Sequence, residues 1–419
     1  MKKVSKFALA LLPILAMTPF LASCVSVSGG SSFIYSNFES YMSPDVEIAL
    51  NEKYGVDFIS YPTNDQIYQL LKNNEVEIVT PSGYEAVSLI EDNLIQKMDW
   101  NKFNIPGVTN SEEAKTLFTP ETVIAMTSFT DKTNEPINLL DYGVPYFAQD
   151  FVFAYRGPKI PALHALDINW KTTLDIVSRE PRFNATIQNS RQPLLWAIDD
   201  ERTLYSIPRL IETNSTNLNP QPNASISELT TTYKHLIDIL APMGKRNFQL
   251  KSDSNVVLNA LADRQAMGAL LYNGDAFFAA YGGDSGVEIP EGDFHIVKPK
   301  NSVVAVEIVA IDNEVVGEKL DKSYDVIKEV NFPITTGTQV IEDTLAYQNF
   351  DYVTYTPTNK ELYDYVLANY FDLTLPVDKL AKEIFLIENI KKSQLENPIS
   401  KMVKSNLFYT YSTYFKDNI

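Results

Sequence analysis

The sequence predicts an α/β protein made of two lobes, each built around a largely parallel sheet. Short segments rich in β-branched and aromatic residues alternate with segments of helical periodicity, which is typical of strands joined by crossover helices. The chain has 419 residues, of which 45% are hydrophobic, so it can bury a large core and divide into two units of ordinary domain size. In such sheets ligands bind beyond the carboxyl ends of the strands.

The alternation begins with a short apolar strand at residues 33–35. Ser43 is expected to cap the following helix, with Pro44 at its first position, and Gly55 is expected to end it. The next predicted elements are a strand at 56–61, a helix at 65–73, a strand at 77–79 and a helix that follows a turn at 81–83. Later segments predict helices at 229–240, 256–262 and 324–330 and a strand at 303–311.

The first residues of the chain have the pattern of a signal peptide. Three lysines precede an apolar run at residues 7–22, and Leu-Ala-Ser-Cys at residues 21–24 resembles a bacterial lipobox. We therefore expect residues 1–23 to be removed, Cys24 to be lipidated and residues 24–32 to form a tether. The mature protein would lie outside the cytoplasm, anchored to the bacterial cell membrane.

The charge balance argues against several kinds of partner and site. Lys and Arg number 35 against 53 Asp and Glu, so the net charge is -18, the wrong sign for binding nucleic acid. The signal peptide carries three positive and no negative charges, so its removal leaves -21. One Cys, three His and no glycine-rich phosphate loop predict neither a metal site nor a nucleotide cofactor. Residues 283–286 (Gly-Asp-Ser-Gly) lack the surroundings of a catalytic serine and are interpreted as a turn, so we expect no enzymatic activity.

Several motifs resemble the spermidine/putrescine-binding proteins of ABC importers. In residues 33–103 a strand, an aromatic pair, a helix opened by Pro and a Pro-Ser-x-Tyr turn follow the order of that family. Further matches are Val-Pro-Tyr at 144–146, GALLYNGDAF at 268–277 and YTPTN at 355–359, and the resemblance is weakest from residue 373 onward.

The resemblance implies a type II periplasmic-binding-protein fold, in which two α/β lobes close over a ligand in the cleft between them. It assigns residues 33–148 plus 305–357 to the first lobe and residues 149–304 plus 358–419 to the second. It also implies a monomer that binds a polyamine or a similar small cation and delivers it to ABC permease subunits.

The same resemblance implies the ligand-binding residues. Aromatic walls would hold the methylene chain of a polyamine, and carboxylates would hold its ammonium groups. Glu307 matches an acidic anchor of the family, but Ala305 replaces an aromatic residue, and Asn189 and Gln192 align with an acidic pair three residues apart. The predicted ligand contacts are Phe38, Glu39, Tyr41, Ser82, Tyr84, Asn189, Gln192, Ser252, Tyr272, Asp275, Glu307 and Tyr355.

Two alternatives to polyamine import stay open at the level of the sequence. The fold could serve a changed ligand, such as another amine, a cationic vitamin or a peptide, because the aligned carboxylates are incomplete. The chain could also be a surface lipoprotein with no transported ligand.

Overall fold

The fold is taken from a computed structural model, which describes residues 33–61, 64–131, 133, 135–213, 218–244, 247–337, 339–385, 387 and 394–419. The predicted signal peptide, Cys24 and the tether lie outside these residues, so their predictions stay as stated. In the part of the chain that is described, no helix combines the length and the apolar character needed to span a membrane.

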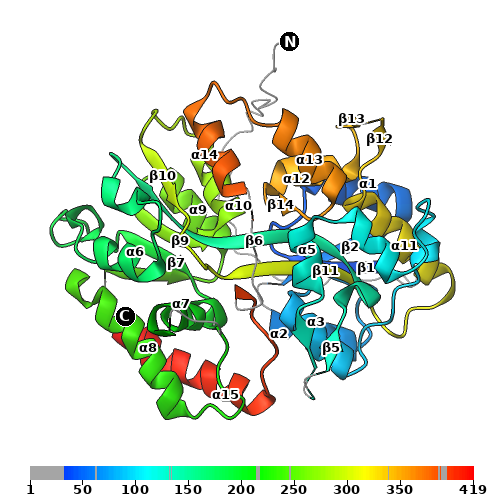
Figure 1. Ribbon diagram of the computed structural model, residues 1–419, viewed down its shortest axis with the longest axis horizontal. Coiled ribbons are helices and arrows are strands. Elements are labelled where there is room, and N and C mark those ends of the chain that lie inside the picture. Colours follow the sequence, from blue (N-terminus) through cyan, green and yellow to red (C-terminus); the bar gives the residue numbers. More distant parts are fainter. Residues whose placement is uncertain are drawn as a thin grey trace, which may run out of the picture. The chain divides into compact units, whose positions relative to one another are not determined.

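Two groups of parallel strands form the centres of the two lobes (Figure 1). In the first lobe β1 (Phe33–Phe38) pairs in parallel with β2 (Val56–Tyr61) and β3 (Ile78–Val79). In the second lobe β7 (Leu195–Ile198) pairs in parallel with β8 (Phe248–Lys251) and β9 (Gly268–Tyr272). The predicted α/β class and two-lobed fold are therefore confirmed.

Two long strands join these groups, and they run antiparallel to their neighbours. The strand β6 (Gly143–Arg156) pairs with β11 (Val304–Ile311) through its first half and with β9 through its second half. Figure 1 shows β6 and β11 side by side across the middle of the molecule. The sheet is therefore mixed rather than largely parallel, because periodicity in a sequence reports burial and not strand direction.

The remaining strands are short, and the helices surround the sheet. The other strands are β4 (Phe129–Thr130), β5 (Pro136–Ile137), β10 (Phe294–Val297), β12 (Thr335–Thr336), β13 (Gln339–Val340) and β14 (Thr356–Pro357). The helices are α1 (Pro44–Tyr54), α2 (Asn64–Lys72), α3 (Gly83–Glu91), α4 (Ser111–Ala114), α5 (Pro120–Met126), α6 (Trp170–Val177), α7 (Glu201–Thr213), α8 (Ile226–Leu240), α9 (Ser254–Ala262), α10 (Asn273–Ala280), α11 (Gly317–Asn331), α12 (Leu345–Val353), α13 (Lys360–Asn369), α14 (Pro376–Phe385), α15 (Lys401–Thr410) and α16 (Lys416–Asn418).

The predicted elements are present, with differences at their ends. The helix α1 ends at Gly55, whose φ of 63° is a conformation that glycine adopts without strain. Ser43 stands at the cap position of α1, but its side chain makes no cap hydrogen bond, and its backbone N–H donates to Asn349 instead. Residues 283–286, which the sequence predicts to be a turn, form a turn after α10.

Alternating residues of β6 separate two cores in the second lobe. Phe151, Phe153 and Tyr155 enter one core, whereas Val152 and Ala154 enter the other, as the two-residue period of a strand requires. The first lobe has its own core around β1, β3 and β11. The helix α13 packs on β13 and β14 and contributes to that first core, which favours assigning residues 360–369 to the first lobe.

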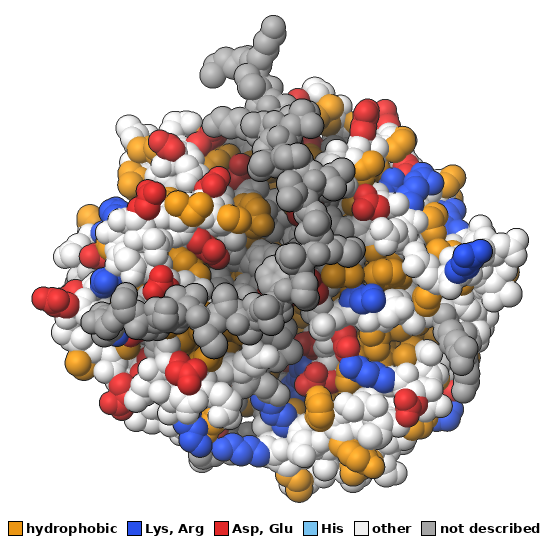
Figure 2. Space-filling view, turned by 180° about the vertical axis from the view of Figure 1, so that it is seen from behind, with side chains coloured by type: hydrophobic (Ala, Val, Ile, Leu, Met, Phe, Trp, Pro, Cys, Tyr) orange, Lys and Arg blue, Asp and Glu red, His pale blue; other side chains and the backbone are white. Residues whose placement is uncertain are grey.

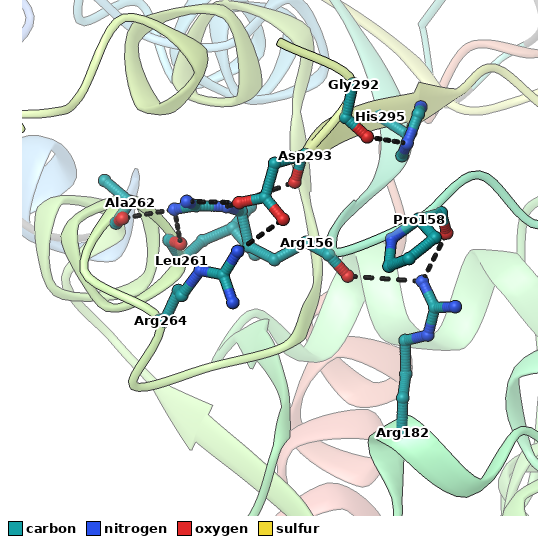
Figure 3. A network of polar contacts seen from close by, with 9 residues as sticks. All are labelled: Arg156, Pro158, Arg182, Leu261, Ala262, Arg264, Gly292, Asp293 and His295. Carbon is teal, nitrogen blue, oxygen red and sulfur yellow. Dashed lines mark hydrogen bonds and ion pairs between the residues drawn. The ribbon is translucent and has the colours of Figure 1, made fainter. Parts of the chain in front are cut away.

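A buried ion pair lies where β6 meets α9 (Figure 3). Arg156, which is 2% exposed, donates from Nη2 to Asp293 Oδ2 at 2.7 Å and from Nη1 to the carbonyl oxygens of Leu261 and Ala262. Arg264 also pairs with Asp293. Burial alone would raise the pKa of Asp293, but the hydrogen bonds from the two arginines outweigh it and hold that pKa below its ordinary value.

Candidate ligand-binding cleft

A cavity of about 140 Å³ lies between the two lobes, at the carboxyl ends of their parallel strands. Its first-lobe wall comes from the ends of β1 and β2 and from the start of α3, and its second-lobe wall from the segments after β7, β8 and β9. The lining residues are Phe38, Glu39, Tyr41, Tyr61, Asn64, Ser82, Tyr84, Gln149, Ile198, Asp200, Thr203, Ser252, Asp253, Ser254, Tyr272, Asp275, Ala305, Glu307, Tyr355 and Glu396.

Most of the predicted ligand contacts meet around this cavity. Those that line it are Phe38, Glu39, Tyr41, Ser82, Tyr84, Ser252, Tyr272, Asp275, Glu307 and Tyr355. The chain therefore brings together residues that are up to about three hundred positions apart, as a site between two lobes requires. Whether each of them contacts a ligand stays a prediction.

Asn189 and Gln192 do not line the cavity, which corrects their predicted place in the site. Asn189 lies in an exposed turn with a φ of 54°, and the side chain of Gln192 is exposed and donates to the carbonyl of Gln265. A pair with the same three-residue spacing does enter the cavity at the start of α7, and it consists of Asp200 and Thr203. One member of that pair is a carboxylate.

Glu307 reaches the cleft at an irregularity in the pairing of β11 with β6, where β6 carries the extra residue. The register between β11 and β6 shifts between Val306 and Ile308, and the backbone of Glu307 bridges to Ser82 instead of continuing the ladder. Such bulges re-aim a side chain, and here the Glu307 side chain accepts a hydrogen bond of 2.8 Å from the hydroxyl of Tyr41. Burial raises the pKa of Glu307 to about 7, although the hydrogen bond from Tyr41 acts in the opposite direction.

Asp275 is a second buried carboxylate of the cleft. Its Oδ1 accepts a hydrogen bond of 2.6 Å from the Tyr355 hydroxyl, and its Oδ2 has no hydrogen-bond partner among the described residues. Burial raises its pKa to about 7. The ring of Tyr355 rests directly on the start of α10, because a Cβ atom at Gly274 would lie only 2.4 Å from Tyr355 Cδ1.

Asp200 and Glu396 were missed by the sequence analysis. Asp200 caps α7 by accepting a hydrogen bond of 2.6 Å from the backbone N–H of Thr203, and Glu396 accepts one of 2.8 Å from the Ser206 hydroxyl. Burial raises the pKa of both carboxyls, to about 7 for Glu396. The acidic run 199–201 after the apolar residues 194–198 was a usable signal for Asp200, whereas no local pattern marks Glu396.

Aromatic rings cover much of the remaining wall. Phe38 and Tyr61 meet with ring centroids 4.7 Å apart, and Tyr41 and Tyr355 meet edge to face at 5.1 Å. Tyr84 is positioned by Asn64, whose amide donates to the Tyr84 hydroxyl at 3.0 Å. Aromatic faces combined with buried carboxylates form a surface that attracts organic cations and repels anions.

One family model matches almost the whole chain. A model of the family described as hypothetical lipoprotein (MG045 family) matches residues 1–416. The chain belongs to this family. No curated protein matches the chain.

Solved structures with the same fold include both binding proteins and an enzyme. A putative spermidine/putrescine ABC transporter protein from Listeria monocytogenes has a TM-score of 0.61 and 16% identity, over 92% of this chain and 98% of that one. The spermidine/putrescine ABC transporter substrate-binding protein from Streptococcus pneumoniae has a TM-score of 0.55 and 15% identity, over 92% and 98%. Thiaminase I from Bacillus thiaminolyticus has a TM-score of 0.55 and 11% identity, over 92% and 99%.

At these identities the likeness establishes the fold, which is that of ABC substrate-binding proteins. The expected resemblance to spermidine/putrescine-binding proteins is thus confirmed in structure. The family description and the fold together indicate an extracytoplasmic lipoprotein. Ligand and partner have to be argued from the residues of the cleft.

Proposed function

We propose that this lipoprotein is the substrate-binding component of an ABC importer, which binds a polyamine in the interlobe cleft and delivers it to the permease subunits. Lipidated Cys24 would hold it at the membrane. The observation that carries the proposal is the set of four carboxyl groups with raised pKa values, Asp200, Asp275, Glu307 and Glu396, around one aromatic-lined cavity.

Buried carboxylates are costly unless a cation accompanies them. In the ligand-free cleft burial disfavours the charged forms of Asp275, Glu307 and Glu396, which is why their pKa values rise to about 7. A ligand that brings ammonium groups removes this penalty, and its methylene chain fits against the tyrosine rings. A neutral sugar or an anion would leave the carboxylates uncompensated.

The size of the cavity favours a short diamine. Its volume of about 140 Å³ is close to that of an engineered cavity of about 150 Å³ that holds benzene. Putrescine (1,4-diaminobutane) has as many non-hydrogen atoms as benzene, whereas spermidine is longer. We therefore expect putrescine to bind more tightly than spermidine.

The mechanism we infer is closure of the two lobes over the ligand. The strands β6 and β11 connect the lobes, and Glu307 lies opposite the bulge of β6, so a ligand held by Glu307 sits at the hinge. Closure would bring the second-lobe carboxylates to the same ligand, and the closed form would dock on the permease.

A ligand panel on the full chain, purified in detergent, tests this function. Putrescine, spermidine, spermine and thiamine are titrated by isothermal calorimetry and thermal shift at low salt. Putrescine should saturate one site and, at about one hundred times its Kd, stabilise the protein by about 2.7 kcal/mol. No saturable response to any amine would refute polyamine transport, and a response to thiamine alone would identify a changed ligand.

A further inference from the structure

The segment that precedes α15 takes part in the cleft. Residues 394–400, here named the C-terminal strap, lead directly into α15. Leu395 pairs with Val304 at the first residue of β11, and on the opposite side Asn219 donates to the Leu395 carbonyl at 3.3 Å. The backbone N–H of Asn397 donates to Asn219 at 2.7 Å. These contacts hold the strap in a defined position beside β11, one of the two strands that connect the lobes.

This fastening directs one strap side chain into the cavity. Glu396 is 9% exposed and lines the cavity beside Asp200. The Ser206 hydroxyl of α7 holds Glu396 Oε1 at 2.8 Å, so the carboxylate has a defined position. Burial is the main reason for its raised pKa, and the neighbouring charge of Asp200 adds to it.

The cavity has a further carboxylate, Glu307, at the hinge, and Tyr272, whose hydroxyl lies 2.9 Å from that of Thr203, lines the same cavity. The pKa of Tyr272 is raised by burial and by the charges of Asp200, Glu396 and Glu307. The pKa of Glu307 is set by its own burial and by hydrogen bonds with Tyr41 and Gln149. One acidic pole is thus at the hinge and the other is where α7 meets the strap.

The charge of Arg202 acts on Asp200 and Glu396. Arg202 does not line the cavity, and it donates from Nη2 to the Asn397 carbonyl at 2.7 Å. Its charge lowers the pKa values of both Asp200 and Glu396 against the effect of burial. The guanidinium therefore offsets part of the negative charge of Asp200 and Glu396, and the remaining charge favours an ammonium group.

We propose that Glu396, carried by the C-terminal strap, binds the second amino group of the ligand together with Asp200 and so selects diamines over monoamines. This inference rests on the proposed function, because it assumes that the first amino group is held at Glu307. It assigns a specificity-determining role to a segment in which the sequence resemblance to polyamine-binding proteins is weakest.

The test compares ligands that differ at one end only. The full chain and its Glu396→Gln, Asp200→Asn and Glu361→Gln variants are titrated calorimetrically with putrescine, 1-aminobutane and 4-aminobutanoate. The control residue Glu361 is exposed on α13, away from the cavity, so its substitution changes the net charge equally. Circular dichroism and thermal midpoints confirm that each variant is folded.

Glu396→Gln should raise the Kd for putrescine by at least about tenfold and change the Kd for 1-aminobutane by less than about twofold. A charged hydrogen bond is lost only for the diamine. Asp200→Asn should show the same pattern and serves as the second reading if Glu396→Gln does not fold. The control variant should match the wild type.

Several results would overturn the inference. Equal losses of affinity for putrescine and 1-aminobutane, or no loss of affinity in either variant, would show that Glu396 does not bind the second amino group. Binding of 4-aminobutanoate as tight as that of putrescine, strengthened by Glu396→Gln, would show that Arg202 receives a carboxylate there. If the wild type binds putrescine and the Glu396→Gln variant binds it equally well, only this inference is contradicted. If the wild type binds no amine, the proposed function is contradicted as well.

Discussion

Replacement of Glu307 by Gln should stabilise the ligand-free protein in a pH-dependent way while it abolishes ligand binding. The folded-state pKa of Glu307 is about 7, against an ordinary value of 4.5. The folded protein therefore keeps a proton that the unfolded chain has lost, and the contribution of Glu307 to stability is full below pH 4.5 and is lost as the pH rises through 7. Gln carries no such penalty and can still accept the hydrogen bond from Tyr41.

The magnitude follows from the size of the pKa shift. The rise of the pKa from 4.5 to about 7, at about 1.4 kcal/mol for each pH unit, corresponds to about 3 kcal/mol in the free energy of unfolding. The free energies of unfolding of the variant and the wild type should therefore be similar at pH 4.5 and differ by about 3 kcal/mol at pH 8, with the variant more stable. Putrescine should stabilise the wild type at pH 8 and leave the variant unchanged.

Urea unfolding of both proteins at pH 4.5, 6, 7 and 8, without ligand, measures this difference. Glu361→Gln, at an exposed position of α13, serves as the matched control and should follow the wild type at every pH. A Glu307→Gln variant that is less stable than the wild type at pH 8, or a difference that does not change with pH, would refute the reasoning.

Three further predictions concern the core, the cleft wall and the protons of the site. Asp293→Ala should cost about 3–5 kcal/mol in urea unfolding because it leaves Arg156 buried without its charge partner, whereas Asp238→Ala, which breaks an exposed pair, should cost less than about 1 kcal/mol. Gly274→Ala should keep the fold and weaken putrescine by at least about tenfold, because its Cβ displaces the ring of Tyr355; unchanged affinity would count against that wall. Putrescine binding at pH 6 should release protons, since ammonium groups lower the raised pKa values of the cleft carboxyls, and calorimetry in buffers of different ionisation enthalpy would detect it. A heat that does not depend on the buffer would contradict this coupling.

Local signals in the sequence predicted the elements whose ends are set by local chemistry. The helix α1 was predicted between Pro44 and Gly55 because proline and glycine restrict the backbone at those positions. The direction of β6 and β11 was not predicted, because both strands are buried on every face and show no alternation. The clustering of aromatic side chains could be predicted only through the resemblance to a family.

The errors at the site have a different cause. Asn189 and Gln192 were placed by alignment with an acidic pair of the family, and the same three-residue spacing occurs at Asp200 and Thr203, where a strand ends and a helix begins. Glu396 follows no helix or strand pattern, and its position depends on contacts with Asn219 and Ser206, which are nearly two hundred residues away in the sequence. Such contacts leave no periodic trace in the chain.

The proposed role of the C-terminal strap would make ligand selectivity depend on completion of the fold. The cavity combines Phe38, near the start of the described chain, with Glu396, which is synthesised and exported after both parallel strand groups. Contacts between such distant positions form late, because closing a long loop costs entropy before any contact compensates for it. A protein whose strap has not yet docked would still expose Glu307 and could hold a monoamine at the hinge. Under the proposed role of Glu396, discrimination between amines would therefore distinguish fully folded molecules from those in which the strap has not docked.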